Sequence, residues 1–226
     1  MTISGIKQEA KITLKGRWGL AVLLTFLYFL ITVVPSLAVE IGTAGGLDNW
    51  LYQESPTPGA QAFNIIFTLA LFPLSAGYYW FFLSESRREG RPISYAFSIY
   101  KNPGLSLKII GAYIMISIFT ILWTLLLIIP GIIKGISYSQ TIFILKDNPE
   151  LSIFEAIRKS KKLMKGHKWK FFLLSLSFIG WGLLTIFTLG IGLLWLIPYT
   201  LTSWCVFYNR ISHVHEDDHT EKEIQI

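Results

Sequence analysis

The chain has 226 residues, of which 52% are hydrophobic and only 15% are charged, and its mean hydropathy is +0.50. Soluble domains carry roughly 25% charged residues, so this composition excludes an ordinary soluble protein and indicates an integral membrane protein. The single cysteine, Cys205, excludes an intramolecular disulfide. The net charge of +6 could suit nucleic acid, but the basic residues lie between apolar blocks. That distribution favours a role in membrane topology and contact with anionic lipid, and we expect no nucleic-acid partner.

The N-terminal segment has basic side chains and apolar residues at helical spacing, which predicts a short interfacial helix that ends before Gly16. Residues 18–39 then carry no charge and can cross a hydrocarbon core of about 30 Å. A cleaved signal peptide ending near Ala38 is the alternative, although this apolar stretch is longer than usual for one. Residues 40–62 contain Gly, Pro and acidic residues but no Lys or Arg, which is typical of an external loop.

The next part of the chain predicts a return to the inside and a third crossing. Residues 63–83 form the second predicted span, and a charged run follows it. Residues 92–107 can form a partly amphipathic surface segment that is broken at Pro103. Residues 109–129 are again apolar and form the third predicted span.

Residues 109–145 hold only one charged side chain, Lys134, and are too long for one straight span. Because proline interrupts helical hydrogen bonding and glycine permits a left-handed turn, Pro130 and the glycine after it predict a tight external hairpin. The fourth predicted span is then residues 132–145. One kinked span over the whole stretch is the alternative.

The C-terminal third predicts one more hairpin, with spans at residues 171–189 and 193–208 around a turn at Gly190 and Gly192. A polar cytoplasmic tail follows at residues 209–226. The predicted fold is therefore all-α, a polytopic membrane protein with six transmembrane helices in three hairpins and cytoplasmic interfacial helices.

Similar spacings recur in the three hairpins. Tyr78 precedes Tyr138 by 60 residues, and Tyr138 precedes Tyr199 by 61. Three equivalent hairpins would pack around an axis along the membrane normal, as parallel repeats do in some transporters. Chance similarity between apolar segments is the alternative interpretation.

The orientation is predicted by the segment of residues 146–170, which carries eight of the chain's 20 Lys and Arg residues. Basic segments between spans stay in the cytoplasm because their translocation is costly. The six-span arrangement places all the basic residues except Lys134 inside. It predicts a multi-pass plasma-membrane protein with both termini in the cytoplasm.

Several motifs resemble a known family. They include the Lys7 to Gly16 opening, Asp147-Asn148-Pro149, and residues 123–135, 164–166, 176–181 and 188–192. On these motifs the chain resembles the integral membrane proteins of Firmicutes known as domain of unknown function 975. The resemblance implies a multi-span plasma-membrane protein and brings no agreed activity with it. The long external loop and the acidic, His-containing tail depart from that pattern.

A membrane-surface helix is predicted within the basic segment. Ser152 and Glu155 have the spacing of a capping box and predict a helix start. Ile157 and Met164 occupy the apolar side, which we expect to enter the acyl boundary with Phe154. The opposite side holds the residues predicted to bind anionic lipid: Arg158, Lys159, Lys161, Lys162 and Lys165. A solvated loop that only sets topology is the alternative.

A second candidate site is Lys134 with Tyr138 and Gln140 as ligand-binding residues, since ionisable groups at membrane depth are often functional. Snorkelling of Lys134 to the outer interface is the alternative.

Candidate chemistry is otherwise sparse. The tail histidines between His213 and His219 could form only a weak metal site, and we interpret them as part of a disordered tail. The sequence predicts no metal site, no cofactor and no enzyme activity. We expect a non-enzymatic protein of the bacterial cell envelope, with a role in resistance or immunity to membrane-active peptides through lipid or protein contacts. A small transporter or channel subunit is the alternative, and a lipid-modifying enzyme is a third.

Overall fold

A computed structural model describes the backbone of residues 2–224 and the side chains of residues 2–212. Within these residues all the regular elements are helices, as the sequence predicts. The helices, with η1 and η2 as short 3₁₀ helices, are α1 (Ile3–Leu14), α2 (Trp18–Ala44), α3 (Leu47–Tyr52), α4 (Pro58–Ser86), η1 (Ile93–Lys101), α5 (Pro103–Leu126), α6 (Ile128–Tyr138), α7 (Thr141–Asp147), α8 (Ile153–Leu163), α9 (Lys168–Leu184), η2 (Thr185–Thr188) and α10 (Leu193–Ile224).

Five stretches of the described chain are long and apolar enough to cross a membrane: Trp18–Ala44, Pro58–Ser86, Pro103–Leu126, Ile128–Asp147 and Lys168–Thr188. They correspond to the first five predicted spans. The sixth predicted span, residues 193–208, forms the first half of α10. The chain is therefore a multi-pass membrane protein by the length and composition of its helices, since each stretch can cover the bilayer core of about 30 Å.

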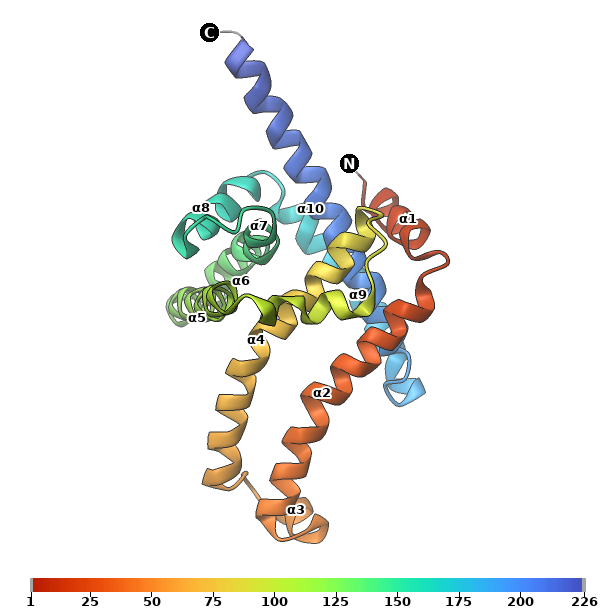
Figure 1. Cartoon of the computed structure of the whole chain (residues 1–226), viewed down its shortest axis with the longest axis vertical. Helices are drawn as coiled ribbons and strands as arrows, with labels where there is room; N and C mark the ends of the chain where they lie inside the picture. Colours follow the sequence, from red (N-terminus) through yellow and green to blue (C-terminus); the bar gives the residue numbers. More distant parts are fainter. Residues whose placement is uncertain (1, 225–226) are drawn as a thin grey trace.

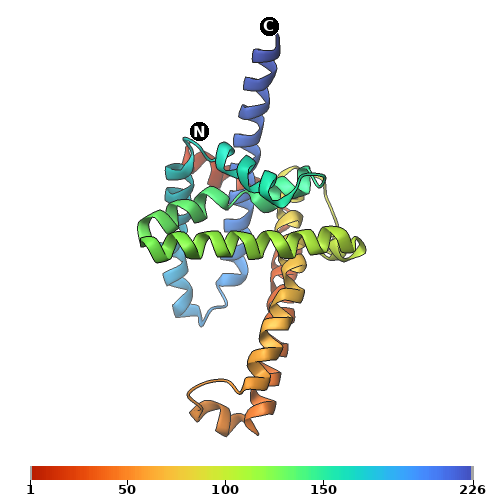
Figure 2. The ribbon, with the colours of Figure 1, turned by 90° about the vertical axis from the view of Figure 1, so that its left-hand side faces the viewer.

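The long helices have two directions. α2 and α4 run side by side to a far end that α3 closes, and α10 packs against both of them (Figure 1). α5 and α6 pack on each other and lie crosswise to α4, α9 and α10 (Figure 2). The three predicted hairpins are thus not equivalent units around one axis, because the second pair is turned away from the direction of the other two.

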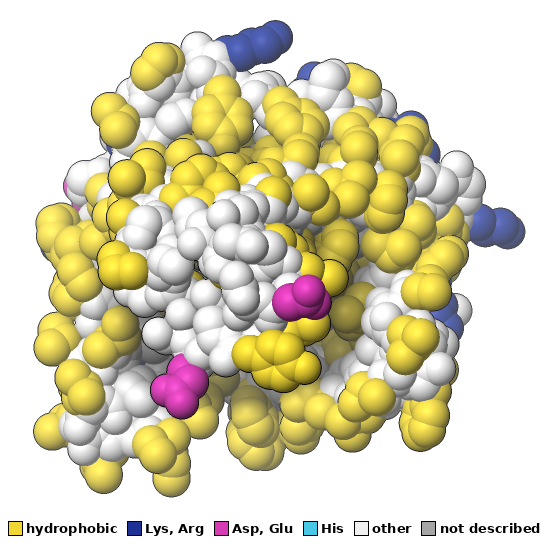
Figure 3. All heavy atoms as spheres, turned by 90° about the horizontal axis from the view of Figure 1, so that it is seen from below, with side chains coloured by type: hydrophobic (Ala, Val, Ile, Leu, Met, Phe, Trp, Pro, Cys, Tyr) yellow, Lys and Arg dark blue, Asp and Glu magenta, His cyan; other side chains and the backbone are white. Residues whose placement is uncertain are grey.

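The lower face of the molecule is mainly hydrophobic. Figure 3 shows this face with yellow side chains over most of it, acidic side chains near its centre and Lys or Arg only at its rim. In α4 the burial changes along the helix: its first half is largely exposed, whereas Phe81, Phe82 and Leu83 are fully buried. Tyr78 stacks on Tyr28 with ring centroids 4.4 Å apart, which joins α4 to α2.

The break in residues 109–145 lies at Leu127, not at Pro130. Leu127 is extended (φ −160°, ψ 139°), and α6 begins at the next residue. Pro130 lies in the first turn of α6, where a helix tolerates proline because that turn's N–H groups have no helical partner. Gly131 also has a different role from the predicted turn: a Cβ there would lie 2.1 Å from Thr124 Oγ1, so glycine lets α5 and α6 approach closely.

The other predicted boundaries differ less from those of the structure. The Gly190 turn is confirmed, with a left-handed glycine (φ +85°) between η2 and α10. The external loop of residues 40–62 is shorter than predicted, since α2 runs on to Ala44 and α4 begins at Pro58. The backbone of the predicted tail continues α10 as a helix to Ile224. The side chains of its histidines, from His213 on, lie outside the described residues.

Candidate functional site

The basic helix α8 begins at the predicted capping box. The Ser152 N–H donates to Glu155 Oε2 at 2.8 Å, and the Glu155 N–H donates to Ser152 Oγ at 3.3 Å. Each side chain thus accepts a hydrogen bond from a backbone N–H that has no helical partner in the first turn. The hydrogen bond from the Ser152 hydroxyl lowers the pKa of Glu155 below its ordinary value. The sequence alone predicted this helix start correctly.

Most of the apolar side of α8 packs on the protein. Ile157 and Met164 are 4% and 0% exposed, so the prediction that they enter the acyl boundary is wrong. Phe154 is 55% exposed and remains accessible. The reason is that α5, α6 and α7 pack against α8, so protein covers the face that the sequence pattern assigns to the membrane.

The predicted lipid-binding residues form the open side of α8 and of the turn that follows it. Arg158, Lys159, Lys161, Lys162 and Lys165 are all exposed. α8 separates two hollows, and Arg158 borders both of them. Because the other side of the helix is fixed to the protein, these cations are presented on a rigid element.

The smaller hollow, which we name the α5–α6–α8 pocket, has a volume of about 430 Å³. It combines aromatic walls with three cations, and its lining residues are Phe119, Trp123, Lys134, Tyr138, Phe154, Ile157, Arg158 and Lys161. The Lys134 Nζ atom lies 4.2 Å from the centre of the Trp123 ring, a cation–π contact. The pocket therefore joins two sets of residues that the sequence treats as separate sites.

Lys134 lies beside the basic helix and not at an opposite end of the molecule. Together with Tyr138 it lines the same pocket as Arg158 and Lys161. Gln140, the third residue of the predicted ligand set, does not line this pocket: it is fully buried, and its side-chain amide donates to Ser139 Oγ at 2.7 Å. The sequence could not separate Gln140 from the other two because the chain breaks between α6 and α7.

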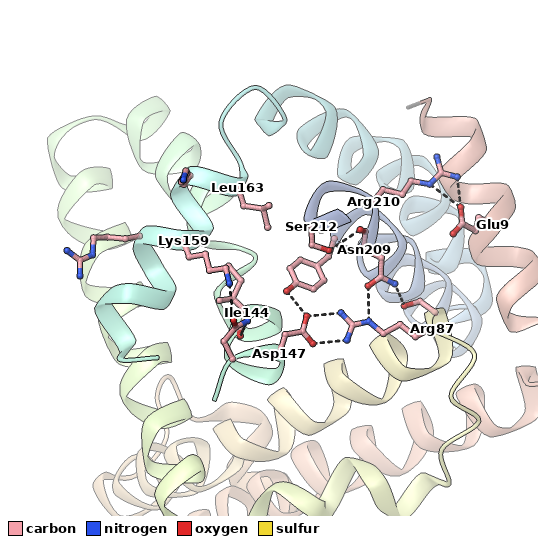
Figure 4. A pocket seen from close by; sticks show the side chains of 14 residues that line it. Glu9, Arg87, Ile144, Asp147, Lys159, Leu163, Asn209, Arg210 and Ser212 are labelled. Carbon is pink, nitrogen blue, oxygen red and sulfur yellow. Dashed lines mark hydrogen bonds and ion pairs between the residues drawn. The ribbon is translucent and has the colours of Figure 1, made fainter. Parts of the chain in front are cut away.

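The larger hollow, the polar basin, has a volume of about 1080 Å³ on the other side of α8 (Figure 4). Its floor is a network around Asp147. Arg87 Nη1 and Nη2 each donate to one Asp147 oxygen at 2.7 Å, and the Tyr208 hydroxyl donates to Asp147 Oδ2 at 2.8 Å. Arg87 Nε also donates to Asn209 Oδ1 at 3.0 Å. The network ties the end of α4 to α7 and α10.

The basin contains more cations than carboxylates. Arg210 Nε donates to Glu9 Oε2 at 3.0 Å, and Lys159 Nζ donates to Asn148 Oδ1 at 3.0 Å. The hydrogen bond to Asp147 raises the pKa of Arg87, so this guanidinium stays charged. The pairing of acidic with basic groups makes the basin floor structural.

Sequence reasoning missed the network around Asp147 because its residues are 60 or more positions apart in the chain. Only the single Asp at the end of an apolar span indicated a partner.

In the described part of the chain, no group of three or more His, Cys, Asp or Glu side chains is placed to hold a metal ion. The architecture is that of a multi-pass α-helical membrane protein with a basic helix packed on one end. The family described as "Protein of unknown function (DUF975)" matches residues 93–215, more than half of the chain. The chain belongs to this family. No curated protein and no solved structure matches it.

Proposed function

We propose that this protein is a non-enzymatic integral membrane protein of the bacterial plasma membrane that acts through contacts with anionic lipid. Both termini and α8 lie in the cytoplasm in this proposal. The orientation rests on the positive-inside rule, because the segment with α8 is the most basic part of the chain.

The observation that carries the proposal is the division of α8 into two sides. Ala156, Ile157 and Leu163 are buried against the protein, whereas the cationic side chains are exposed. A basic helix that floats freely in the interface inserts its apolar face, but α8 uses that face for anchoring. Each cation near an anionic leaflet contributes roughly 1 kcal/mol to lipid contact, so several of them on a fixed helix give a strong preference for anionic headgroups.

Copurified lipid tests this proposal. We expect phosphatidylglycerol or another anionic lipid to be enriched in the detergent-solubilised protein relative to the bulk membrane. Replacing Lys161, Lys162 and Lys165 together with Gln should reduce the enrichment. A matched variant with Lys15, Arg88 and Lys101 replaced by Gln changes the net charge equally at other exposed positions, and should reduce it less. Retained lipid of bulk composition in the wild-type protein would contradict the proposal.

The biological role that we propose is resistance or immunity to membrane-active peptides, with a peptide or membrane protein as a further partner. An exposed basic, aromatic-rich surface at the membrane could alter how cationic peptides reach anionic lipid. A gene deletion should change sensitivity to such peptides. Unchanged sensitivity to cationic peptides and to membrane stress would exclude this role.

The alternative is a small transporter or channel subunit. It requires a polar route that passes Lys134 and continues to the far side of the membrane. The walls around Lys134 are largely aromatic, which supports an amphipathic ligand more directly than an ion or a small hydrophilic solute.

A further inference from the structure

The α5–α6–α8 pocket is lined by positive charges that favour binding of an anion. Lys134 comes from α6, whereas Arg158 and Lys161 come from α8, and all three line one hollow of about 430 Å³. Within the described residues none of the three forms an ion pair with a carboxylate. Small-molecule sites have volumes of about 300–1,000 Å³, so the pocket is large enough for one headgroup.

A hydrogen bond outside the pocket fixes the level of α6 relative to α8. Ser160 of α8 donates a hydrogen bond of 2.8 Å to the Ser137 carbonyl of α6, one turn from Lys134. α6 and α5 run crosswise to the spanning direction of α4, α9 and α10 (Figure 2). A hairpin that crossed the bilayer would carry Lys134 away from the basic helix, but the structure keeps them together.

The tip of the α5–α6 hairpin is apolar and exposed. Residues 125–129 are all Leu or Ile, and their exposed fractions lie between 63% and 79%. An aqueous location would leave five large apolar side chains in water, whereas hydrocarbon would solvate them favourably. If Lys134 lies on the cytoplasmic side, all 20 Lys and Arg residues can satisfy the positive-inside rule.

We propose that the α5–α6–α8 pocket binds the phosphodiester of an anionic phospholipid from the cytoplasmic leaflet, and that the α5–α6 hairpin lies in that leaflet without crossing the bilayer. The site rests on the proposed function and narrows it to one bound lipid. Lys134, Arg158 and Lys161 surround the phosphate, and the apolar side chains of the hairpin contact the acyl chains.

A lipid suits this pocket better than free phosphate does. Phe119, Trp123 and Phe154 supply apolar and aromatic walls, and Phe154 stays 55% exposed at the rim. Aromatic rings of this kind settle at the headgroup level, where one edge contacts hydrocarbon and the other contacts polar groups. Free phosphate would gain nothing from these walls.

Native mass spectrometry of the full-length protein with added phosphatidylglycerol tests the site. We expect one lipid to remain bound most tightly, and Lys134→Gln to weaken that binding about fivefold. Lys134→Arg should restore it, because it keeps the charge. Lys101→Gln is the matched control: Lys101 is exposed and lines neither hollow, so it should have a smaller effect. A large excess of inorganic phosphate should not displace the lipid.

The outcomes separate the site from the general function. If the wild-type protein retains no anionic lipid, both proposals fail. If it retains anionic lipid but Lys134→Gln weakens binding no more than Lys101→Gln does, this pocket is not the site and the general proposal stands. Displacement of the lipid by inorganic phosphate would mean that the pocket holds free phosphate.

The position of the hairpin has its own test. In a Cys205→Ser background, we expect a cysteine at Lys134 to react with an impermeant thiol reagent in inside-out vesicles and not in intact cells. Reaction in intact cells would place Lys134 outside and overturn the proposal. Failure to react from either side would also overturn it, because the pocket must open at the cytoplasmic surface.

Discussion

The Ser160 hydroxyl joins the basic helix to the crosswise hairpin through Ser137, to whose carbonyl it donates a hydrogen bond of 2.8 Å. The same hydroxyl accepts a hydrogen bond from the Gln140 N–H at 3.3 Å. Both backbone groups lie at the break between α6 and α7, where the regular helical pattern is interrupted. One side chain of α8 therefore provides hydrogen-bond partners for two backbone groups at the break between α6 and α7.

Replacing Ser160 with Ala should destabilise the protein by about 1–3 kcal/mol, because two buried backbone groups lose their partner. Thermal unfolding in mild detergent measures the effect as a lower Tm. Ser117→Ala is a matched control, since Ser117 is an exposed serine on α5 and should change Tm little. Equal shifts for the two variants would contradict the role of Ser160.

Replacing Gly131 with Ala should disrupt the contact between α5 and α6. The new Cβ would lie 2.1 Å from Thr124 Oγ1 and 2.8 Å from Thr124 Cα, and the backbone atom cannot move away by rotating a side chain. We expect a loss of about 1–3 kcal/mol of stability, as for overpacked interiors. At Gly180, which has open space around it, the same replacement should stabilise the helix by about 1 kcal/mol. A neutral Gly131→Ala variant would argue against this close packing.

Asp147→Asn should loosen the polar basin. It removes a paired charge from Arg87 and weakens the acceptor of the Tyr208 hydrogen bond. Since both side chains of the ion pair are partly exposed, we expect a cost of about 1–2 kcal/mol in the free energy of unfolding. Glu89→Gln is the matched control, because Glu89 pairs with Arg91 only two residues away, and its effect should be under about 1 kcal/mol. The prediction is that Asp147→Asn lowers the free energy of unfolding more than Glu89→Gln does.

The cap of α8 should make stability depend on pH. The folded pKa of Glu155 lies below its ordinary value of 4.5. The stabilisation is therefore fully present above pH 4.5 and is lost as the pH falls through the lower folded pKa. Glu155→Gln keeps the amide-capping geometry but removes the charge, so the Tm difference from the wild type should shrink on acidification. A constant difference across this range would contradict the assignment.

The helical elements and the start of α8 could be predicted from the sequence because they depend on local signals. Three such signals are apolar stretches of sufficient length, the capping box at Ser152 and the glycine turn at Gly190. Each depends only on residues that are close together in the sequence. The sequence predicts the break at Pro130, three residues after its position at Leu127, because Pro130 is tolerated in a first helical turn and Leu127 carries no breaker signal.

The direction of α5 and α6 could not be predicted, because hydrophobic length is compatible with crossing the bilayer or lying within it. The same ambiguity explains the error for Ile157 and Met164: an apolar helix face looks alike whether protein or lipid covers it. Lys134 and Lys161 line one pocket, and Arg87 pairs with Asp147, because distant segments of the chain pack together. No local sequence pattern predicts these two arrangements.

The orientation of α8 is the claim on which the lipid proposals depend, and cysteine labelling of intact cells tests it most directly. In a Cys205→Ser background, single cysteines replace Asn49 near the far end of α2 and Lys165 just after α8, both of which are exposed positions. We predict that an impermeant thiol reagent labels the cysteine at Asn49 and leaves the one at Lys165 unlabelled until the cells are opened. Labelling at Lys165 in intact cells would place the basic helix outside and contradict the account.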